Sequence, residues 1–254
     1  MMETPDSGRG WHARGYLPHF DRAGVVQGIT FRLHDSVPEH VIAGWKRELN
    51  WMDRSRHHGP FNSGNKAENL KGKLVEYLNT EEDVYEPAEK NENEEPGPSP
   101  GPEAEQKEQM AAQRKELHRR IAVYEDAGAG DCWLKRPPVA SMMVDALTHF
   151  DGQRYNLLAW CVMPNHVHVL TQPLPGHAVG DVVHSWKRFS AREANRQLNR
   201  VGQPFWALDY YDRCIRHEAH FERARNYIHR NPVKAGLCAT PEQWPWSSAA
   251  RTNK

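Results

Sequence analysis

The sequence predicts an α+β protein built on a ferredoxin-like βαββαβ antiparallel sheet, with an extra helix at the C-terminal end. The first observation is a pair of β-type runs, residues 154–162 and 166–172, separated by Met163-Pro164-Asn165. Proline and asparagine favour a turn there, so the two runs form a hairpin. The second is the order strand, helix, strand, strand, helix, strand, helix along the chain, which matches the ferredoxin-like order.

The first half supplies one strand and three helices. Residues 25–33, VVQGITFRL, have the β-branched content of a strand, and Pro38 then opens a helix with the sequence PEHVIAGWKRELNWM. Residues 109–127 have the composition of a second helix. Pro138 starts a third, which runs through VASMMVDALTHF up to the hairpin.

The second half supplies an amphipathic helix, an extended segment and a last helix. Between residues 177 and 199 apolar side chains recur at helical spacing, while arginines recur every fourth residue on another face. Residues 204–216 are extended. The last helix runs from about His217 to Asn231, because Pro232 stops it and Gly236 follows closely.

An acidic insertion interrupts this pattern. Residues 80–109 hold eleven Asp and Glu against two Lys, are rich in Pro and Gly, and have few large apolar side chains. Such a segment buries too little surface to offset its conformational entropy, which predicts a disordered linker. We therefore expect a flexible tail over 1–14, one discontinuous domain over 15–50 and 131–249, and an insertion over 51–130.

Bulk composition excludes several classes of protein. The 254 residues have a formal net charge of zero, but outside 80–109 the chain carries 31 basic and 22 acidic residues, an excess that suits a nucleic-acid partner. No apolar run approaches the roughly 18 residues that span a bilayer, and the first residues lack a secretory pattern, so we expect a cytoplasmic protein without a membrane partner. The four cysteines are widely separated and form no CxxC pair, which predicts reduced thiols.

His166 and His168 are the first candidates for chemistry. Side chains at positions i and i+2 of a strand leave the sheet on the same side, so both imidazoles share one face. Neutral imidazole is a common metal ligand. The alternative is an exposed or hydrogen-bonded pair of strand histidines without a metal.

A longer string of motifs gives this pair a context. The segments AWCVMPNHVHVL, WKRFSA, FW, YYDRCIR, YIHRNPVKAGL and WPWSSA follow one another, and GYLPHF and ITFRLHDSVP precede them. In this order and spacing they resemble the REP-associated tyrosine transposases of bacteria, a branch of the single-tyrosine HUH nucleases. The resemblance covers residues 15–50 and about 131–249, which it implies are one HUH catalytic domain.

The resemblance implies a mechanism and its residues. His166 and His168 match the HUH pair that holds the metal, Tyr227 matches the nucleophile, and Asn231 matches the third ligand, with Mg²⁺ or Mn²⁺ as the ion. The i, i+4 relation places Tyr227 and Asn231 on one helix face. Attack by the phenol would form a 5′-phosphotyrosine and release a 3′-hydroxyl, and the reverse attack would rejoin strands without ATP.

Other tyrosines and another role for Tyr227 stay open at this point. Tyr227 lies at the border of the apolar stripe formed by Phe221, Ala224 and Ile228, where a tyrosine often packs its ring and leaves the hydroxyl in water. Tyr210 and Tyr211 are the rival nucleophiles.

The resemblance also implies a substrate, a short hairpin repeat with adjoining single-stranded DNA. Relatives read it partly with the segment before the first strand, which corresponds to YLPHF here. The predicted DNA contacts are Tyr16, His19, Lys187, Arg188, Arg192, Arg196, Arg213 and Arg216, with an ordinary solvated face as the alternative for the arginine stripe. We expect a monomer associated with the nucleoid, and we expect Trp244 and Trp246 to pin the C-terminal tail to the core.

Two other functions remain possible from the sequence. One is a protein that binds DNA hairpins without cleaving them. The other is a metal-dependent hydrolase of a small phosphate ester that uses the histidine pair with water. The presence of all the suspected catalytic residues favours the transposase, and the basic helix argues against the hydrolase.

Overall fold

The computed structural model describes residues 10–14, 17–21, 23–56 and 102–251. The chain divides into two compact units, one made of Met1–Ser36 with Glu125–Lys254 and the other of Val37–Tyr124. This division falls after Ser36, whereas the sequence placed the boundary after residue 50. The helix that follows Pro38 therefore belongs with the insertion and not with the sheet.

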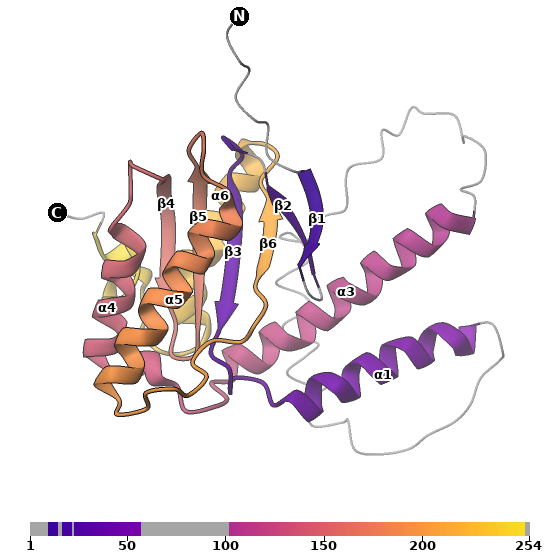
Figure 1. The fold of residues 1–254 in the computed structure, drawn as a ribbon, viewed down its shortest axis with the longest axis horizontal. Coiled ribbons are helices and arrows are strands. Elements are labelled where there is room, and N and C mark those ends of the chain that lie inside the picture. The colour runs from indigo at the N-terminus through magenta and orange to yellow at the C-terminus, as the bar shows by residue number, and fades with distance from the viewer. Residues whose placement is uncertain (1–9, 15–16, 22, 57–101, 252–254) are drawn as a thin grey trace, which may run out of the picture. The chain divides into compact units, whose positions relative to one another are not determined.

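The first unit is built on a four-stranded antiparallel sheet. Its strands are β3 (Gln27–Arg32), β4 (Tyr155–Val162), β5 (His166–Pro173) and β6 (Tyr211–Cys214). They lie in the order β4-β5-β3-β6, and each neighbouring pair is antiparallel (Figure 1). In this order the first and third strands of the βαββαβ pattern occupy the centre, which confirms the predicted ferredoxin-like sheet.

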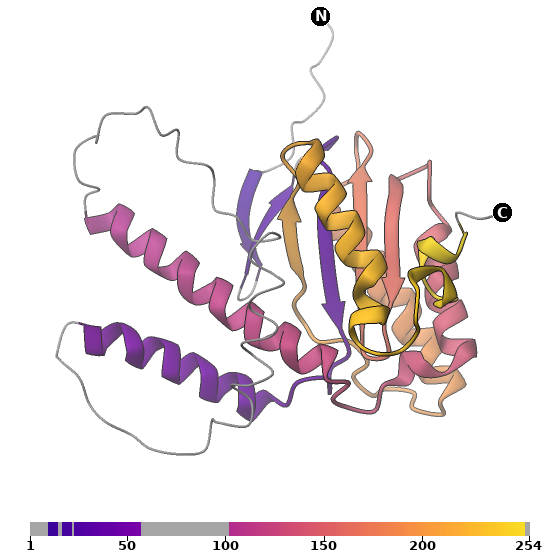
Figure 2. The same ribbon diagram turned by 180° about the vertical axis from the view of Figure 1, so that it is seen from behind.

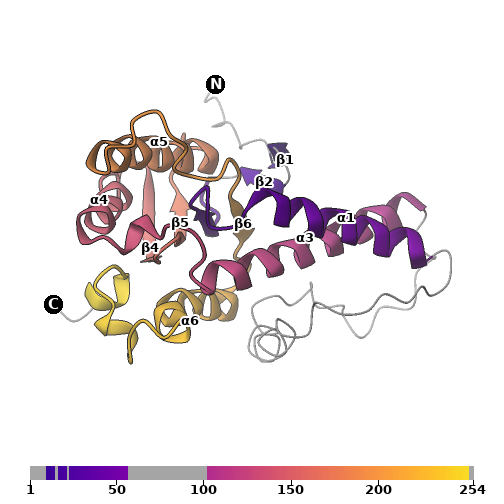
Figure 3. The ribbon, with the colours of Figure 1, turned by 90° about the horizontal axis from the view of Figure 1, so that it is seen from below.

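Helices cover both faces of the sheet. The helix α4 (Pro137–Thr148), which begins with proline at its first position, packs beside α5 (Val179–Gln197) on one face. The helix α6 (Glu218–Lys234) lies on the other face (Figures 2 and 3). The helix that crosses from β3 to β4 against this sheet is therefore α4, and not the helix predicted to start at Pro38.

Two buried clusters follow from the alternation of the strands. Val167 and Val169 of β5 point toward α5 and join a cluster that includes Trp186. Leu170 points to the opposite face and packs with Ala224 and Ile228 of α6. Because each buried aliphatic side chain contributes about 1.5–3 kcal/mol, the pattern fixes the register of β5, and His166 and His168 must face α6.

The second unit contains the helices α1 (Glu39–Arg56) and α3 (Pro102–Asp126), of which the last two residues of α3 belong to the first unit. Trp45 and Tyr124 pack edge to face with ring centroids 5.7 Å apart, and Arg120 forms a 2.7 Å ion pair with Glu48.

The predicted linker over 80–109 needs a correction at its C-terminal end, because residues 102–109 are helical; the rest lies outside the described residues. Proline is favoured at the first position of a helix, which Pro102 occupies. The Glu, Ala, Gln and Lys residues that follow it have high helix propensity, even without large apolar side chains.

At the N-terminal end, β1 (Gly10–Arg14) and β2 (Leu17–Asp21) form a separate antiparallel pair. Residues 10–14 therefore do not form the flexible tail predicted over 1–14. Tyr16 lies outside the described residues. His19 belongs to β2, but its side chain is outside the described part, so both predicted base contacts stay predictions.

The last helix passes the residue predicted to stop it. Pro232 lies inside α6, which ends at Lys234. The backbone N–H of Gly236 donates to Val233 O at 2.9 Å and that of Leu237 to Pro232 O at 2.8 Å, and Gly236 has a φ of +70°. This is a Schellman ending, so the glycine terminates the helix and not the proline.

Short helical turns at Trp133–Lys135, Pro241–Gln243 and Ser248–Arg251 complete the first unit. The tail is tied to β4 as predicted, because Trp244 Nε1 donates to Val162 O at 3.0 Å and Val162 N donates to Trp246 O at 2.8 Å. The four cysteines are free thiols. Across the described ranges, each helix is too short or too polar to cross a lipid bilayer.

Candidate metal and nucleophile site

The two histidines of β5 meet beneath α6. His166 is 1% exposed and His168 is 5% exposed. Their Nε2 atoms lie 2.9 Å apart, and their rings are nearly perpendicular. The spacing on one strand therefore brings both imidazoles together, as the sequence predicted.

The other nitrogen of each ring is held by a neighbour. Thr30 lies directly opposite His168 in the register of β3 and β5, and its Oγ1 is 2.8 Å from His168 Nδ1. Asn165, the last residue of the hairpin turn, places its Oδ1 2.8 Å from His166 Nδ1. Both Nε2 atoms are thereby directed at each other and toward α6.

The helix α6 adds an amide and a phenol. Asn231 is 1% exposed, and its Nδ2 lies 2.9 Å from His168 Nε2. Its Oδ1 has no hydrogen-bond partner among the described residues, and a half-turn of the amide directs this oxygen at the same place. Tyr227 packs its ring edge to face against His168 with centroids 5.5 Å apart.

These atoms fit a divalent metal. Burial lowers the pKa of His166 to about 3, so its imidazole stays neutral and keeps a lone pair. Two imidazole nitrogens and one amide oxygen form a mixed donor set. Within the described part of the chain, no three His, Cys, Asp or Glu side chains are grouped to hold an ion, and the Asn231 amide oxygen is a candidate third ligand beside the two histidines.

Charged side chains border the site. Asp126 Oδ1 lies 3.8 Å from His166 Nε2 and adds negative potential beside the histidines. Lys234 Nζ lies 5.8 Å from the centre of the Tyr227 ring. Neither residue was predicted from the sequence. Lys234 follows Asn231 by three positions, so helical spacing could have predicted that it lies near the site. No sequence pattern links Asp126 to the hairpin.

The rival tyrosines occupy other positions. Tyr210 packs against the cluster on the α4 and α5 face. Tyr211 lies opposite Thr30, so it shares the face of His168 but is on the far side of β3. Since adjacent strands are about 4.8 Å apart, Tyr211 is about two strand spacings from His168. The Tyr227 ring, by contrast, contacts the ring of His168.

The arginine stripe of α5 is exposed but distant from the histidines. Arg192 and Arg196 form ion pairs with Glu193 at 3.3 and 3.1 Å. Arg188 is exposed on the same helix. Because the sheet separates α5 from α6, these arginines and the histidines cannot contact the same phosphate (Figure 3).

Lys187 has a structural role that the sequence did not indicate. Its ammonium group donates to the carbonyl oxygens of Ala207 and Leu208 at 2.8 and 2.9 Å. Burial lowers the pKa of Lys187 to about 8. The side chain holds the segment before β6, and this geometry gives no support to the predicted phosphate contact.

Positive charge gathers where β6 leads into α6. Arg213 lies in β6, and Arg216 is exposed just before the helix. Burial, reinforced by the charges of Arg213 and Arg223, lowers the pKa of His220 to about 4. This region leads directly into α6, so Arg213 and Arg216 lie on the chain close to the helix that carries Tyr227, unlike the α5 stripe.

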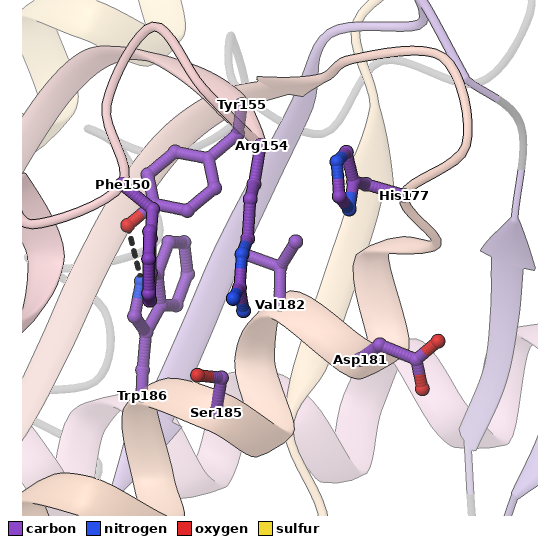
Figure 4. Close-up of a pocket in the computed structure, with 8 residues that line it drawn as sticks. All are labelled: Phe150, Arg154, Tyr155, His177, Asp181, Val182, Ser185 and Trp186. Carbon is purple, nitrogen blue, oxygen red and sulfur yellow. Dashed lines mark hydrogen bonds between the residues drawn. The ribbon is translucent and has the colours of Figure 1, made fainter.

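A pocket lies on the opposite face of the sheet (Figure 4). It is lined by Phe150, Arg154, Tyr155, His177, Asp181, Val182, Ser185 and Trp186. Tyr155 and Trp186, which are joined by a 2.8 Å hydrogen bond, belong to the cluster beneath α4 and α5. The pocket is therefore separate from the histidine pair.

Comparison with known proteins gives three similarities. Residues 145–231 match the family described as "Transposase IS200 like". A protein of Haemophilus influenzae described as a REP-associated tyrosine transposase is 28% identical over 111 residues, which is 39% of this chain and 62% of that relative. A solved REP-associated tyrosine transposase bound to a REP hairpin aligns over 94% of this chain and 83% of its own, with 12% identity and a TM-score of 0.41.

The sequence matches confirm the resemblance that the motifs indicated. The family match contains His166, His168, Tyr227 and Asn231, so the whole candidate site falls within it. The chain spans less than two thirds of the length of the Haemophilus influenzae relative.

Proposed function

We propose, taking residues 145–231 as an IS200-like transposase domain, that this chain cuts and rejoins single-stranded DNA beside REP-like hairpin repeats. Tyr227 is the nucleophile, and His166, His168 and Asn231 hold Mg²⁺ or Mn²⁺. The observation that carries the proposal is the meeting of the β5 histidines with Asn231 and Tyr227 of α6.

The chemistry follows from the four side chains. A phenol with an ordinary pKa near 10 is a weak nucleophile at neutral pH. A bound divalent ion would polarise the scissile phosphate and offset its charge. The Tyr227 oxygen attacks phosphorus and loses its proton, the bond to the 3′ oxygen breaks, and that oxygen leaves as a hydroxyl. The 5′-phosphotyrosine keeps the bond energy, so a 3′-hydroxyl can reverse the step.

The substrate class rests on the charge distribution and on the relatives. Outside the acidic segment at 80–109 the chain is basic, and Arg213 and Arg216 concentrate charge near the start of α6. The relatives are named for REP repeats, and one was solved with a REP hairpin bound. We assign single-stranded DNA next to such a hairpin as the substrate, and we place the enzyme with the DNA of the nucleoid.

One chain supplies the whole site. The helix α6 packs against β4 and β5 of its own sheet, so the histidines and Tyr227 come together without a second copy. We therefore expect a monomer to be active. A cleavage rate per chain that is constant across dilution in a range where sedimentation shows monomers would bear this out.

The test is a covalent adduct. The protein is incubated with a labelled hairpin oligonucleotide that has a single-stranded flank, with Mn²⁺, Mg²⁺ or a chelator, and is then run on a denaturing gel. We expect a shifted protein–DNA band with either metal and none with the chelator. Hairpin binding without a band would instead identify a non-cleaving binding protein, and neither binding nor a band would favour a hydrolase of small esters.

A further inference from the structure

Asn165 occupies a buried place between the hairpin turn and the last turn of α3. Its side chain is 1% exposed, and its Nδ2 lies 3.0 Å from the carbonyl oxygen of Glu125 and 2.9 Å from that of Ala129. Carbonyl oxygens only accept hydrogen bonds, so the group that faces both of them must be the NH₂. The orientation of this amide is therefore fixed by its surroundings.

The fixed amide determines the proton position on His166. With Nδ2 committed to two carbonyls, the Asn165 oxygen faces His166 Nδ1 at 2.8 Å. An amide oxygen accepts only, so Nδ1 must carry the hydrogen. A neutral imidazole has one N–H, which leaves the lone pair of His166 on Nε2, the atom that faces His168.

The second histidine is held less strictly. His168 Nδ1 meets the hydroxyl of Thr30, which can either donate or accept. Thr30 is therefore compatible with both tautomers of His168, whereas Asn165 is compatible with one tautomer of His166.

We propose that Asn165 is a positioning residue that locks His166 in the Nδ1–H tautomer and so presents its Nε2 lone pair to the metal. The lock is anchored on the backbone of residues 125–129, at the end of the insertion. The part of this inference that concerns the metal rests on the proposed function, whereas the tautomer follows from the hydrogen bonds alone.

The test reads the tautomer directly in metal-free protein labelled with ¹⁵N-histidine. Long-range ¹H–¹⁵N correlation spectra distinguish Nδ1–H from Nε2–H, and His166→Gln identifies the His166 signals. We expect pure Nδ1–H in the wild type. Asn165→Ala should give a mixture of tautomers and bind Mn²⁺ about 10- to 100-fold more weakly in calorimetry, the range found when an outer partner of a metal-bound histidine is lost.

Two further variants separate positioning from folding. Asn165→Asp keeps an acceptor for Nδ1–H, so it should keep the tautomer even though it loses both donations to the backbone and lowers stability. Asn156→Ala removes a half-buried amide of β4 that donates to Gln172 Oε1, and it should leave both the tautomer and the Mn²⁺ affinity unchanged.

The outcomes are distinguishable. Nε2–H on His166 in the wild type, or an Asn165→Ala protein with wild-type tautomer and Mn²⁺ affinity, overturns the inference. If the wild type shows Nδ1–H but binds no Mn²⁺, the metal-dependent function fails while the tautomer lock stands. Should Asn165→Ala not fold, the wild-type and Asn165→Asp spectra decide the matter.

Discussion

At the scale of single residues, Glu125 is a carboxyl group buried beside the site. It is 3% exposed, Arg32 Nε lies 3.6 Å from its Oε1, and the Asp126 carboxylate follows it in the chain. Burial raises the pKa of Glu125 to about 8, the charge of Asp126 adds to this, and the charge of Arg32 opposes it. Burial therefore favours the protonated form of Glu125 in the folded protein.

This burial predicts a loss of stability with rising pH. The folded pKa is above the unfolded value of 4.5, so the folded state binds more protons between pH 4.5 and 8. The contribution of Glu125 is complete below 4.5 and is lost as pH rises through 8, with a slope of at most about 1.4 kcal/mol per pH unit.

Glu125→Gln removes this titration and keeps the shape of the side chain. We expect its free energy of unfolding, measured by denaturant titration, to rise relative to the wild type from pH 5 to 8. If Glu125 instead forms a charged pair with Arg32, the variant will be less stable by a constant amount across this range.

Asn231 gives a second prediction at this scale. Asn231→Ala keeps Tyr227 but removes the amide ligand, so Mn²⁺ binding should weaken about 10-fold or more and excess Mn²⁺ should partly restore cleavage. Titration of metal in calorimetry and in the adduct assay measures both. Asn226→Ala, an exposed position on the same helix, is the matched control, and equal metal affinity in the two variants would remove Asn231 from the site.

Sequence motifs were enough to predict that His166, His168, Tyr227 and Asn231 lie together, but they did not predict the neighbours of these residues. The i, i+2 spacing of His166 and His168 on a strand places both side chains on one face. The i, i+4 spacing of Tyr227 and Asn231 does the same on a helix. Thr30 lies beside His168 because of the pairing register of β3 and β5, and Asp126 lies beside His166 although the two are far apart in the sequence. Neither position follows from local spacing. Helical spacing also cannot show that the Lys187 ammonium group donates to the carbonyl oxygens of Ala207 and Leu208.

At the scale of elements, the arginine stripe of α5 is predicted to affect binding and not chemistry, because the sheet separates it from Tyr227. Replacing Arg188, Arg192 and Arg196 with Gln should weaken hairpin binding. It should also reduce the slope of log K against log salt by up to about 3, with cleavage unchanged at saturating DNA.

Glu193→Gln is the opposing control for this stripe, because Glu193 pairs with two of the three arginines. It should strengthen hairpin binding at low salt. An unchanged salt slope in the triple variant, measured by fluorescence anisotropy, would show that α5 contacts no phosphate.

The ends of two helices, α6 and α3, differ from the sequence prediction because neighbouring residues favour different structures there. The sequence ended the last helix at Asn231 because proline lacks an N–H, yet the hydrogen bonds of Gly236 and Leu237 extend it to Lys234. The acidic composition around Pro102 predicted disorder, although the Glu, Ala, Gln and Lys that follow this proline favour a helix. The sheet order was predictable because strand alternation and hairpin geometry are both local.

At the scale of the whole molecule, the sheet of the first unit has two faces that carry different groups of residues. One face, beneath α6, carries the histidines, Asn231 and Tyr227, with basic residues nearby. The other carries the main core, the α5 arginines and the pocket of Figure 4. The DNA cleavage that we propose therefore belongs to the α6 face.

The central claim, that Tyr227 forms the covalent bond to DNA, is tested most directly by locating the attached tyrosine. After reaction with a hairpin oligonucleotide and Mn²⁺, the adduct is digested with nuclease and trypsin and analysed by mass spectrometry. Tyr227 lies in the tryptic peptide NYIHR, whereas Tyr210 and Tyr211 lie together in VGQPFWALDYYDR. We predict that the nucleotide remnant is on NYIHR and is absent from a Tyr227→Phe protein; a remnant on VGQPFWALDYYDR, or an adduct that persists in Tyr227→Phe, would contradict the account.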